Sequence, residues 1–411
     1  MPTPRNFSVL VINSGSSSVK FTLFNIEDEA VLARGIVERI GLEGTRIVYA
    51  AHNGKKLDRL ADVGDAREAV ASIVECLVDQ GHGVLQSRQA VAAVGHRVVH
   101  GGEKINSSVI IDDHVKKVIQ EYARLAPLHN PPNLEGIEAC EHSFPDSSQV
   151  AVFDTAFHAT LPEKAFLYGL PYELYTEGKI RRYGFHGTSH RYVSQEAARY
   201  LGRPLKDLKM VTCHLGNGSS ITAVDGGRSV DTSMGLTPLE GIVMGTRCGT
   251  IDPAIVTHLM QHEGLTVDQV NVLLNKKSGF LGMAGIGSSD VRDVLAAMDE
   301  GHARSAAAIH VFVHQIRKYL GAYTAVMNGL EAVVFTGGVG ENAAVIREMV
   351  CNGDGGMEML GIRLDPGKNA SADQEACAIQ ANGSPVSILV IPTDEEKEIA
   401  RQTVALLNLS V

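Results

Sequence analysis

Four charged side chains in this sequence stand where phosphoryl-transfer chemistry would need them. Arg97 and Asp154 lie at the ends of apolar runs typical of strands, and His186 and Arg247 lie in glycine-containing turns. Moving a phosphoryl group to an oxygen requires neutralisation of charge on its equatorial oxygens and in-line alignment, with little covalent help. Guanidinium groups bind such oxyanions bidentately. Each residue alone could instead form a surface ion pair of little energetic value, so the interpretation depends on the elements around them.

Two turns rich in glycine and serine could hold phosphate groups. Residues 13–18 follow the apolar run 9–12, and residues 216–219 follow the apolar run 210–215. Glycine lets a ligand approach the backbone closely, and serine adds hydrogen-bond donors without bulk. Ordinary hairpin turns have the same composition, and for one turn alone that simpler interpretation is preferable. The repetition of the pattern in both halves of the chain favours phosphate binding.

A third glycine-rich segment supports a nucleotide site. Residues 332–336 predict a buried strand, residues 337–342 read Gly-Gly-Val-Gly-Glu-Asn, and residues 343–350 predict a helix. A strand that ends in glycines before a helix can hold a nucleotide base or its phosphates. The glycine spacing differs from the dinucleotide fingerprint, and the P-loop pattern is absent from the sequence. The predicted nucleotide site is therefore neither of the Rossmann nor of the P-loop type.

Several pairs of histidines have the four-residue spacing at which a helix can hold zinc. Among them are His96 with His100, His186 with His190, and His310 with His314. Only the last pair lies in a clearly predicted helix, and none has the glutamate beside the first histidine that the metalloprotease motif requires. Solvated histidines are the better interpretation for that helix.

The elements that must position these residues form two similar sets. Each glycine-rich turn joins an apolar strand to a second strand, once near residue 10 and again near residue 212. Helices with apolar stripes are predicted around residues 70–78, after Asp65, and around residues 309–323. Strands that alternate with helices indicate an α/β fold, and the repeated hairpin indicates two duplicated lobes with a cleft between them. The end of the strand at Asp154 is a plausible hinge.

Composition excludes several classes of function. The chain has 411 residues, a net charge of −10 and no long basic cluster, so nucleic acid is not expected as a partner. No stretch approaches the ~18 apolar residues of a membrane span. The 6 cysteines are scattered without a C-x-x-C pair, which indicates reduced thiols in a cytoplasmic protein.

Taken together, the motifs closely resemble those of the acetate kinase family. Residues 11–20 (Val-Ile-Asn-Ser-Gly-Ser-Ser-Ser-Val-Lys) resemble its first signature and residues 181–190 (Arg-Arg-Tyr-Gly-Phe-His-Gly-Thr-Ser-His) its second. The likeness runs from about residue 8 to about residue 400. It implies the actin-like ATPase fold, with two ribonuclease-H-like lobes comprising residues 1–154 joined by 394–411, and residues 155–393. It also implies a homodimer that interconverts ATP and acetate with ADP and acetyl phosphate, using Mg²⁺, for which Mn²⁺ can substitute.

The resemblance assigns roles to individual positions. The implied catalytic residues are Asp154, His186 and Arg247, and the implied metal ligands are Asn13 and Glu395. The implied substrate site comprises Arg97, His129 and an apolar pocket of Val99, Leu128, Phe185 and Pro238. The implied nucleotide site comprises Lys20, His214, Leu215, Gly216, Asn217, Gly218, Asp290, Val291, Arg292, Gly338, Val339, Gly340, Glu341 and Asn342.

Physical chemistry constrains the role of Asp154. Acetate is already ionised at neutral pH, because carboxylic acids have pKa values of about 4 to 5. No proton has to be removed, so we expect Asp154 to position Arg97 or Mg²⁺ rather than to act as a base. Residue 394 is aspartate, where relatives of this family commonly have asparagine. The extra carboxylate could alter metal binding beside Glu395.

Two alternatives remain open at this stage. Propionate kinases share nearly every motif, and one methylene changes discrimination by only about 1 to 3 kcal/mol. Residues 249–254 look more like those of acetate kinases. A protein of a different class, a nucleotide-switched binding protein, would need a nucleotide cleft but no pocket for a small acid. The combination of Arg97, His186 and Arg247 favours the enzyme.

Overall fold

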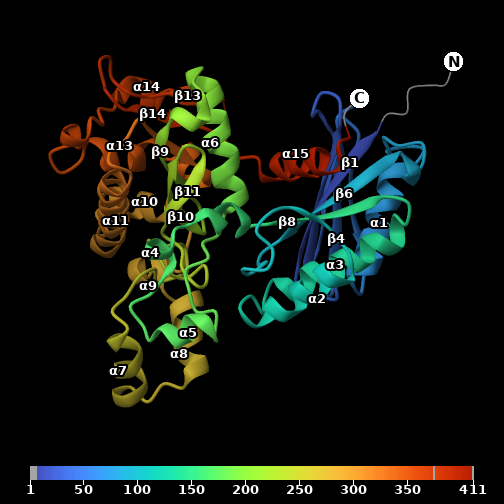
Figure 1. Cartoon of the computed structure of the whole chain (residues 1–411), viewed down its shortest axis with the longest axis horizontal. Helices are drawn as coiled ribbons and strands as arrows, with labels where there is room; N and C mark the ends of the chain where they lie inside the picture. The colour runs from blue at the N-terminus through green and yellow to red at the C-terminus, as the bar shows by residue number, and fades with distance from the viewer. Residues whose placement is uncertain (1–6, 374, 410–411) are drawn as a thin grey trace. The chain divides into compact units, whose positions relative to one another are not determined.

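The computed structural model describes residues 7–373 and 375–409, which divide into two compact units (Figure 1). Unit 1 contains the described residues of Met1–Phe157 and Asp394–Val411, and unit 2 contains those of His158–Thr393. The first division of the chain thus follows Phe157, whereas the expected lobe boundary follows Asp154. That each unit is a separate domain stays a prediction.

Unit 1 is built on an eight-stranded sheet with the order β5-β4-β3-β2-β1-β6-β8-β7. Its strands are β1 (Ser8–Gly15), β2 (Ser18–Asn25), β3 (Val31–Glu38), β4 (Thr45–Ala51), β5 (Lys56–Ala61), β6 (Val91–Val98), β7 (Val109–Ile110) and β8 (Ser148–Phe153). Its helices are α1 (Ala66–Val78), α2 (Asp113–Glu121), α3 (Asn130–Ser143) and α15 (Glu395–Leu407). Strands β1, β6 and β8 are parallel, so their carboxyl ends meet at one edge.

The central strand β1 is buried on both faces, as its continuous apolar run predicts. Leu10 and Ile12 pack into the core under α1 and α3, while Val9 and Val11 pack against Ile399 of α15. Figure 1 shows α15, at the red end of the colour scale, beside the blue strands β1 and β6. The last helix of the chain therefore completes the first unit.

Unit 2 is built on a six-stranded sheet with the order β11-β10-β9-β12-β14-β13. Its strands are β9 (Lys209–Leu215), β10 (Ser219–Asp225), β11 (Arg228–Thr232), β12 (Ala332–Thr336), β13 (Cys377–Ala378) and β14 (Ser387–Val390). Its helices are α4 (Glu163–Phe166), α5 (Tyr172–Thr176), α6 (Gly187–Leu201), α7 (Ala254–His262), α8 (Val267–Lys276), α9 (Gly279–Ala284), α10 (Val291–Asp299), α11 (Ala303–Met327), α12 (Gly337–Asn342), α13 (Ala344–Asn352) and α14 (Pro366–Ala370).

The two sheets repeat one topology, which confirms the predicted duplication. In each unit an antiparallel hairpin begins the sheet, and its third strand continues it outward, as β1-β2-β3 and as β9-β10-β11. Two parallel strands follow on the other side, β6 and β8 in unit 1 and β12 and β14 in unit 2. A short antiparallel strand, β7 or β13, closes the edge. The fold is thus α/β with two mixed sheets.

The helices expected from sequence are present. Asp65 caps α1 by accepting a hydrogen bond from the backbone N–H of Glu68 at 2.9 Å. The apolar stripe predicted for residues 309–323 lies within α11 and is buried in the core of unit 2. His310 and His314 lie on the exposed side of α11, as expected. His190, in contrast, is buried within α6, a helix that we do not predict there.

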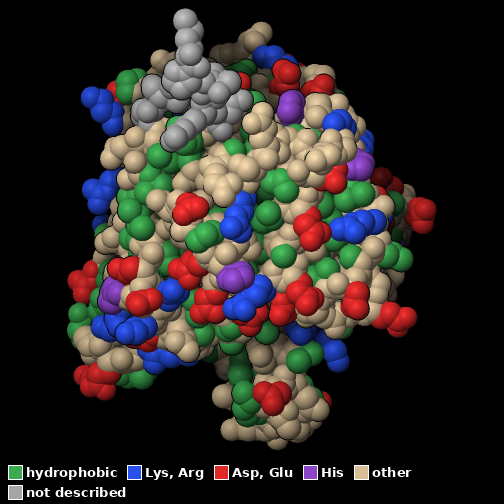
Figure 2. Space-filling model, turned by 90° about the vertical axis from the view of Figure 1, so that its right-hand side faces the viewer, with side chains coloured by type: hydrophobic (Ala, Val, Ile, Leu, Met, Phe, Trp, Pro, Cys, Tyr) green, Lys and Arg blue, Asp and Glu red, His purple; other side chains and the backbone are tan. Residues whose placement is uncertain are grey.

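Charged side chains of both signs are interspersed over the face of the molecule shown in Figure 2. That face presents Lys and Arg side chains beside Asp and Glu rather than a field of one charge. Among the described residues, no helix is both long enough and apolar enough to cross a bilayer. All 6 cysteines are free.

Candidate active site

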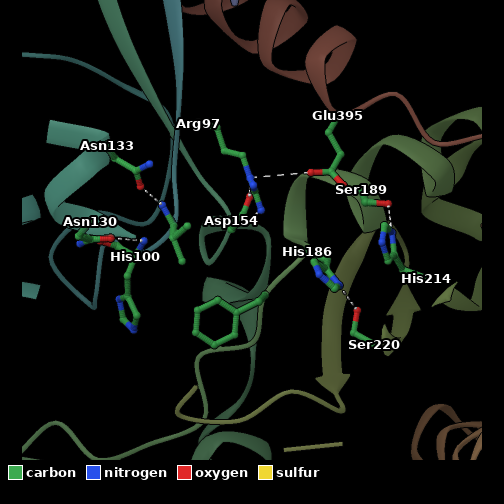
Figure 3. Close-up of polar contacts among 12 residues, drawn as sticks. Arg97, His100, Asn130, Asn133, Asp154, His186, Ser189, His214, Ser220 and Glu395 are labelled. Carbon is green, nitrogen blue, oxygen red and sulfur yellow. Dashed lines mark hydrogen bonds and ion pairs between the residues drawn. The ribbon is translucent and has the colours of Figure 1, made fainter. Parts of the chain in front are cut away.

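The first functional cluster joins Arg97, Asp154 and Glu395 in unit 1. Arg97 lies near the end of β6 and Asp154 directly follows β8, the parallel neighbour of β6. Arg97 donates two hydrogen bonds to Asp154, from Nε to Oδ1 at 3.2 Å and from Nη2 to Oδ2 at 2.6 Å. Glu395, the first residue of α15, lies 3.9 Å from Arg97 Nε (Figure 3). Residues from three distant parts of the chain therefore share one charge cluster.

The charges of this cluster perturb one another. Asp154 is 1% exposed, and its carboxylate raises the pKa of Arg97. Burial raises the pKa of Glu395 to about 7, an effect to which Asp154 and Glu396 add and which Arg97 and Lys20 oppose. Arg97 thus satisfies Asp154 more fully than Glu395. A further cation beside Glu395 would relieve this imbalance.

Asp394 serves as the N-cap of α15. Its side chain accepts a hydrogen bond from the backbone N–H of Lys397 at 2.9 Å. Asparagine and aspartate cap helices about equally well, so the departure from the usual family residue preserves this function. The Asp394 carboxylate is thus engaged by the backbone of the helix.

The residues of unit 1 fit a magnesium ion better than a transition metal. Among the described residues, no group of three or more His, Cys, Asp or Glu side chains could enclose a metal. Mg²⁺ is usually held by one or two protein carboxylates together with waters and substrate phosphates. The partly buried Glu395 carboxylate, with its raised pKa, offers the hard oxygen ligand that such a site needs.

Asn13 and Lys20 face each other across the first hairpin. The pairing of β1 with β2 continues to Gly15 and Ser18, so the expected turn of residues 13–18 is largely strand. Asn and Ser residues can form the backbone hydrogen bonds of a strand, although they are typical of turns. The composition of residues 13–18 therefore did not reveal that most of them belong to strands. The second hairpin keeps a longer loop, because β9 ends at Leu215 and β10 begins at Ser219.

The second functional cluster joins His186, His214 and Arg247 in unit 2. His186 precedes α6 with a left-handed backbone (φ 56°), and its ring lies 4.3 Å from the ring of His214. His186 Nδ1 is hydrogen bonded to Ser220 Oγ at 2.9 Å, and His214 Nδ1 to Ser189 Oγ at 2.8 Å (Figure 3). The two imidazoles are thus held side by side by hydroxyl groups.

Gly218 allows His186 and Arg247 to lie beside the same short loop. A Cβ atom at position 218 would lie 3.4 Å from His186 Nε2 and 3.5 Å from Arg247 Nη1. Arg247 donates a hydrogen bond to the carbonyl of Pro238 at 3.2 Å, and burial lowers its pKa. No carboxylate in the described part of the chain forms an ion pair with Arg247. A partly desolvated guanidinium without an anionic partner favours an anionic ligand.

Two of the pockets in unit 2 have volumes of about 340 Å³ and about 620 Å³. The larger pocket has the volume expected for a nucleotide-sized ligand. It is lined by Gly216, Asn217, Ser289, Asp290, Val291, Arg292, Gly338, Val339, Asn342 and Ala343. Asn217 packs closely against Gly245, because a Cβ atom at position 245 would lie 1.8 Å from the side-chain oxygen of Asn217.

Comparison with known proteins decides the family. The model of the acetokinase family matches residues 8–401. The acetate kinase of Alkaliphilus metalliredigens is 52% identical over 399 residues, which cover 97% of this chain and 100% of that protein. The chain belongs to the acetokinase family. As a member of this kinase family it is an enzyme, a phosphotransferase, and the alternative of a nucleotide-switched binding protein is disfavoured.

Solved structures of an acetate kinase and of a propionate kinase share this fold. The acetate kinase of Porphyromonas gingivalis is 45% identical, with a TM-score of 0.93, and the match covers 98% of this chain and 100% of that chain. A propionate kinase from Francisella tularensis is 41% identical, with a TM-score of 0.89, over 97% of this chain and 99% of that chain. Both similarities extend through both units.

The structure brings together many of the residues that the acetokinase resemblance implies. Most of the implied nucleotide residues line the larger pocket, whereas Leu215 and Gly340 are buried. Glu341 accepts hydrogen bonds from the backbone N–H groups of Gly337 and Thr393, which fixes its carboxylate within the protein. The roles of these residues stay predictions.

The residues implied for the apolar substrate pocket are divided between the units. Val99 and Leu128 belong to unit 1, and Phe185 and Pro238 belong to unit 2. Val99 and Phe185 are buried, whereas Leu128 is 65% exposed. His129 is also exposed. Their assembly into one pocket stays a prediction.

Sequence reasoning missed two buried asparagines that support the first cluster. Asn133 donates to the carbonyl of Ser14 at 2.7 Å and accepts from the backbone N–H of Val99 at 3.1 Å. Asn130 bonds both backbone groups of His100 (Figure 3). Helix α3 thereby fixes the segment after β6 to the first hairpin. Two asparagines three residues apart around Pro131 and Pro132 were the available signal.

Proposed function

We propose that this protein catalyses reversible phosphoryl transfer between ATP and acetate, giving ADP and acetyl phosphate. The observation that carries the proposal is Arg247, a partly desolvated guanidinium without an ion-pair partner among the described residues, beside His186 and the glycine-rich loop. Such a cation stabilises the charge on the equatorial oxygens of a phosphoryl group during its transfer. The similarity to acetate kinases supports acetate as the acceptor.

In this proposal the clusters of the two units act on the same substrates. Arg97, oriented by Asp154, binds the carboxylate of acetate. His186 and Arg247 neutralise the transferred phosphoryl group, and the pocket lined by Gly216 and Gly338 holds the nucleotide. Val99, Leu128, Phe185 and Pro238 surround the methyl group, and His129 lies near the phosphoryl group. The acceptor oxygen needs no base, because acetate is already ionised.

We further propose that Glu395 and Asn13 hold Mg²⁺, for which Mn²⁺ can substitute. When bound, the ion would offset charge on the phosphate oxygens. Lys20, which faces Asn13 across the hairpin, adds a second positive charge near the same place. We also expect the enzyme to work in the cytoplasm, where its free cysteines would stay reduced.

A hydroxamate assay tests the function directly. Purified protein is incubated with ATP, Mg²⁺, acetate and hydroxylamine, and acetyl phosphate is trapped as acetohydroxamate. We expect product that depends on acetate and on ATP, with a reaction lacking acetate as the control. No product would contradict the proposal and favour a nucleotide-binding role. Comparison of kcat/KM for acetate, propionate and butyrate then tests the alternative suggested by the propionate kinase relative.

The partner that we propose is a second copy of this chain, bound through helix α7. None of the residues of α7 is buried, although Ile255 and Met260 are apolar and are 43% and 37% exposed. A helix of 9 residues is too short to be stable without packing. Figure 1 shows α7 away from the sheet of unit 2.

Two features favour a second copy as the occupant of this surface. A twofold interface brings a surface against itself, and α7 contains no Lys, Arg, Asp or Glu that would repel its own copy. Apolar surface of this kind is typical of homodimer interfaces. A different protein partner would more often show complementary charge.

The variant Ile255→Lys is expected to convert the dimer to a monomer, because it brings like charges into an apolar interface. Light scattering coupled to size exclusion measures the mass directly, and a wild-type dimer should have twice the 43.9 kDa of one chain. Val326→Lys, at a position on α11 that is 51% exposed, is the matched control and should stay dimeric. A monomeric wild type, or a dimeric Ile255→Lys variant, would contradict the proposed interface.

A further inference from the structure

A chain of hydrogen bonds runs from His186 into the core of unit 2. His186 Nδ1 is hydrogen bonded to Ser220 Oγ at 2.9 Å, the contact drawn in Figure 3. The same hydroxyl contacts His190 Nε2 at 2.7 Å, and His190 Nδ1 contacts Thr212 Oγ1 at 2.7 Å. Ser220, His190 and Thr212 are each 0% exposed. These three residues therefore link the proposed phosphoryl-binding histidine to the interior without access to bulk water.

Rigid elements hold every member of this chain. His186 and His190 lie four residues apart at the start of α6, which packs against β9. Thr212 belongs to β9 and Ser220 to β10, and these strands are directly paired. Residues so fixed can orient a ring without motion at the moment of reaction.

The hydrogen bonds between Ser220, His190 and Thr212 can run in only two directions, because His190 is neutral. Burial lowers the pKa of His190 well below its ordinary value, with smaller contributions from His158 and His214. A neutral imidazole donates through one nitrogen and accepts through the other. The hydroxyls of Ser220 and Thr212 must therefore take opposite roles toward His190.

The carbonyl of Thr222 selects one of these polarities. It lies 3.5 Å from Thr212 Oγ1, and a carbonyl oxygen can only accept. With the Thr212 hydroxyl donating toward Thr222, Thr212 accepts from His190 Nδ1–H. His190 Nε2 then accepts from Ser220, and the Ser220 oxygen accepts from His186 Nδ1–H.

We propose that Ser220, His190 and Thr212 are positioning residues that keep a proton on Nδ1 of His186 and leave Nε2 as the nitrogen that gains or loses the proton. An acceptor at Nδ1 is compatible with both the neutral and the cationic ring. The cationic ring can then donate from Nε2 to a phosphoryl oxygen, while the hydrogen bond from Nδ1 to Ser220 stays unchanged. With the opposite polarity, Ser220 would donate to Nδ1 and oppose the cation.

Several charged and titratable groups of unit 2 lie around His186. His214 of β9 lies against its ring, His190 of α6 is joined to it through Ser220, and Arg247 lies beside the same glycine. A change at Thr212 keeps all three residues and removes the hydrogen bond between Thr212 and His190. A change at Thr212 therefore tests the hydrogen-bond chain by itself.

Nitrogen NMR of the histidines in the wild-type protein is the first test. Because it needs no turnover, it is independent of the proposed function. Comparison with His186→Gln assigns the signal of His186. We expect a protonated Nδ1 and a bare Nε2 in the neutral ring. A ring with the proton on Nε2 would overturn the proposal.

Kinetics of two variants at Thr212 are the second test, and this part rests on the proposed function. Thr212→Val removes the hydroxyl at nearly constant shape, and we expect kcat to fall about tenfold with little change in KM, as when a supporting contact is lost. The alkaline limb of the pH profile should move to lower pH, because the cation loses support. Thr212→Ser restores the hydroxyl and should recover kcat.

The matched control is Thr232→Val, which removes an equally buried hydroxyl. That hydroxyl is hydrogen bonded to Thr222 Oγ1 at 2.8 Å and is not part of the hydrogen-bond chain behind His186. The control variant should keep kcat within about twofold of the wild type. Equal loss in Thr212→Val and Thr232→Val would overturn the proposal, as would failure of Thr212→Ser to recover kcat. Absence of wild-type turnover on acetate would instead contradict the proposed function, and the NMR result would still decide the proton position.

Discussion

Replacement of Arg247 by alanine is expected to lower kcat by about two orders of magnitude or more, the loss typical of a transition-state cation. Arg247 has no ion-pair partner among the described residues, and its one charged role in this proposal is toward the phosphoryl group. Its guanidinium contributes most when charge spreads over the equatorial oxygens. KM for acetate and for ATP should therefore change much less than kcat. Steady-state kinetics at saturating Mg²⁺ measure both constants.

The controls for Arg247→Ala separate charge from geometry. Arg247→Lys keeps the charge but loses the planar fork, so an intermediate kcat is expected. Arg203→Ala removes an exposed arginine of unit 2 that pairs with Glu331 at 2.6 Å, and it should leave kcat unchanged. A rise in KM with an unchanged kcat would mark Arg247 as a substrate-binding residue and contradict the proposed role.

The variant Asp154→Asn is expected to lower kcat by about a hundredfold, because Arg97 loses the carboxylate that orients it. An asparagine keeps one oxygen but presents an NH₂ group where the second carboxylate oxygen accepts from Arg97 Nη2 at 2.6 Å. Removal of the negative charge also leaves a cation without its buried partner. The Mg²⁺ concentration needed for half-maximal activity should change too, because Glu395 shares this cluster.

A double-mutant cycle tests whether Asp154 acts through Arg97. The rates of Asp154→Asn, Arg97→Ala and the double variant are compared. If Asp154 positions Arg97, the double variant should be little worse than Arg97→Ala alone. Additive losses would indicate a separate role for Asp154, and near-normal turnover with unchanged Mg²⁺ dependence in Asp154→Asn would contradict its assignment altogether.

Local patterns made much of the fold predictable. The apolar stripe of α11 and the cap of α1 at Asp65 follow from spacing within a few residues, and both are present. The repeated hairpins likewise predicted the duplication that the matched strand orders confirm. The length of the first turn was less predictable, because pairing of Asn13 with Lys20 depends on the partner strand.

The candidate site was predictable as a set of residues and not as an arrangement. Arg97 and Asp154 stood out singly, but their pairing follows from the adjacency of β6 and β8 in the sheet. Ser220 had no signal of a supporting role, and Asn130 and Asn133 had only their spacing around two prolines, because many local structures use such polar residues.

The sequence by itself determined the residue types, the α/β character, the duplication and the membership of the acetokinase family, since each is written in local periodicity or in contiguous motifs. Only the tertiary structure decided that Glu395 lies beside Arg97, that Asp394 caps α15, and that a buried chain of hydrogen bonds lies behind His186. Strand order and helix docking depend on contacts between segments far apart in the chain. Local spacing in the sequence does not specify those contacts, whereas burial and hydrogen bonding in the folded state show them directly.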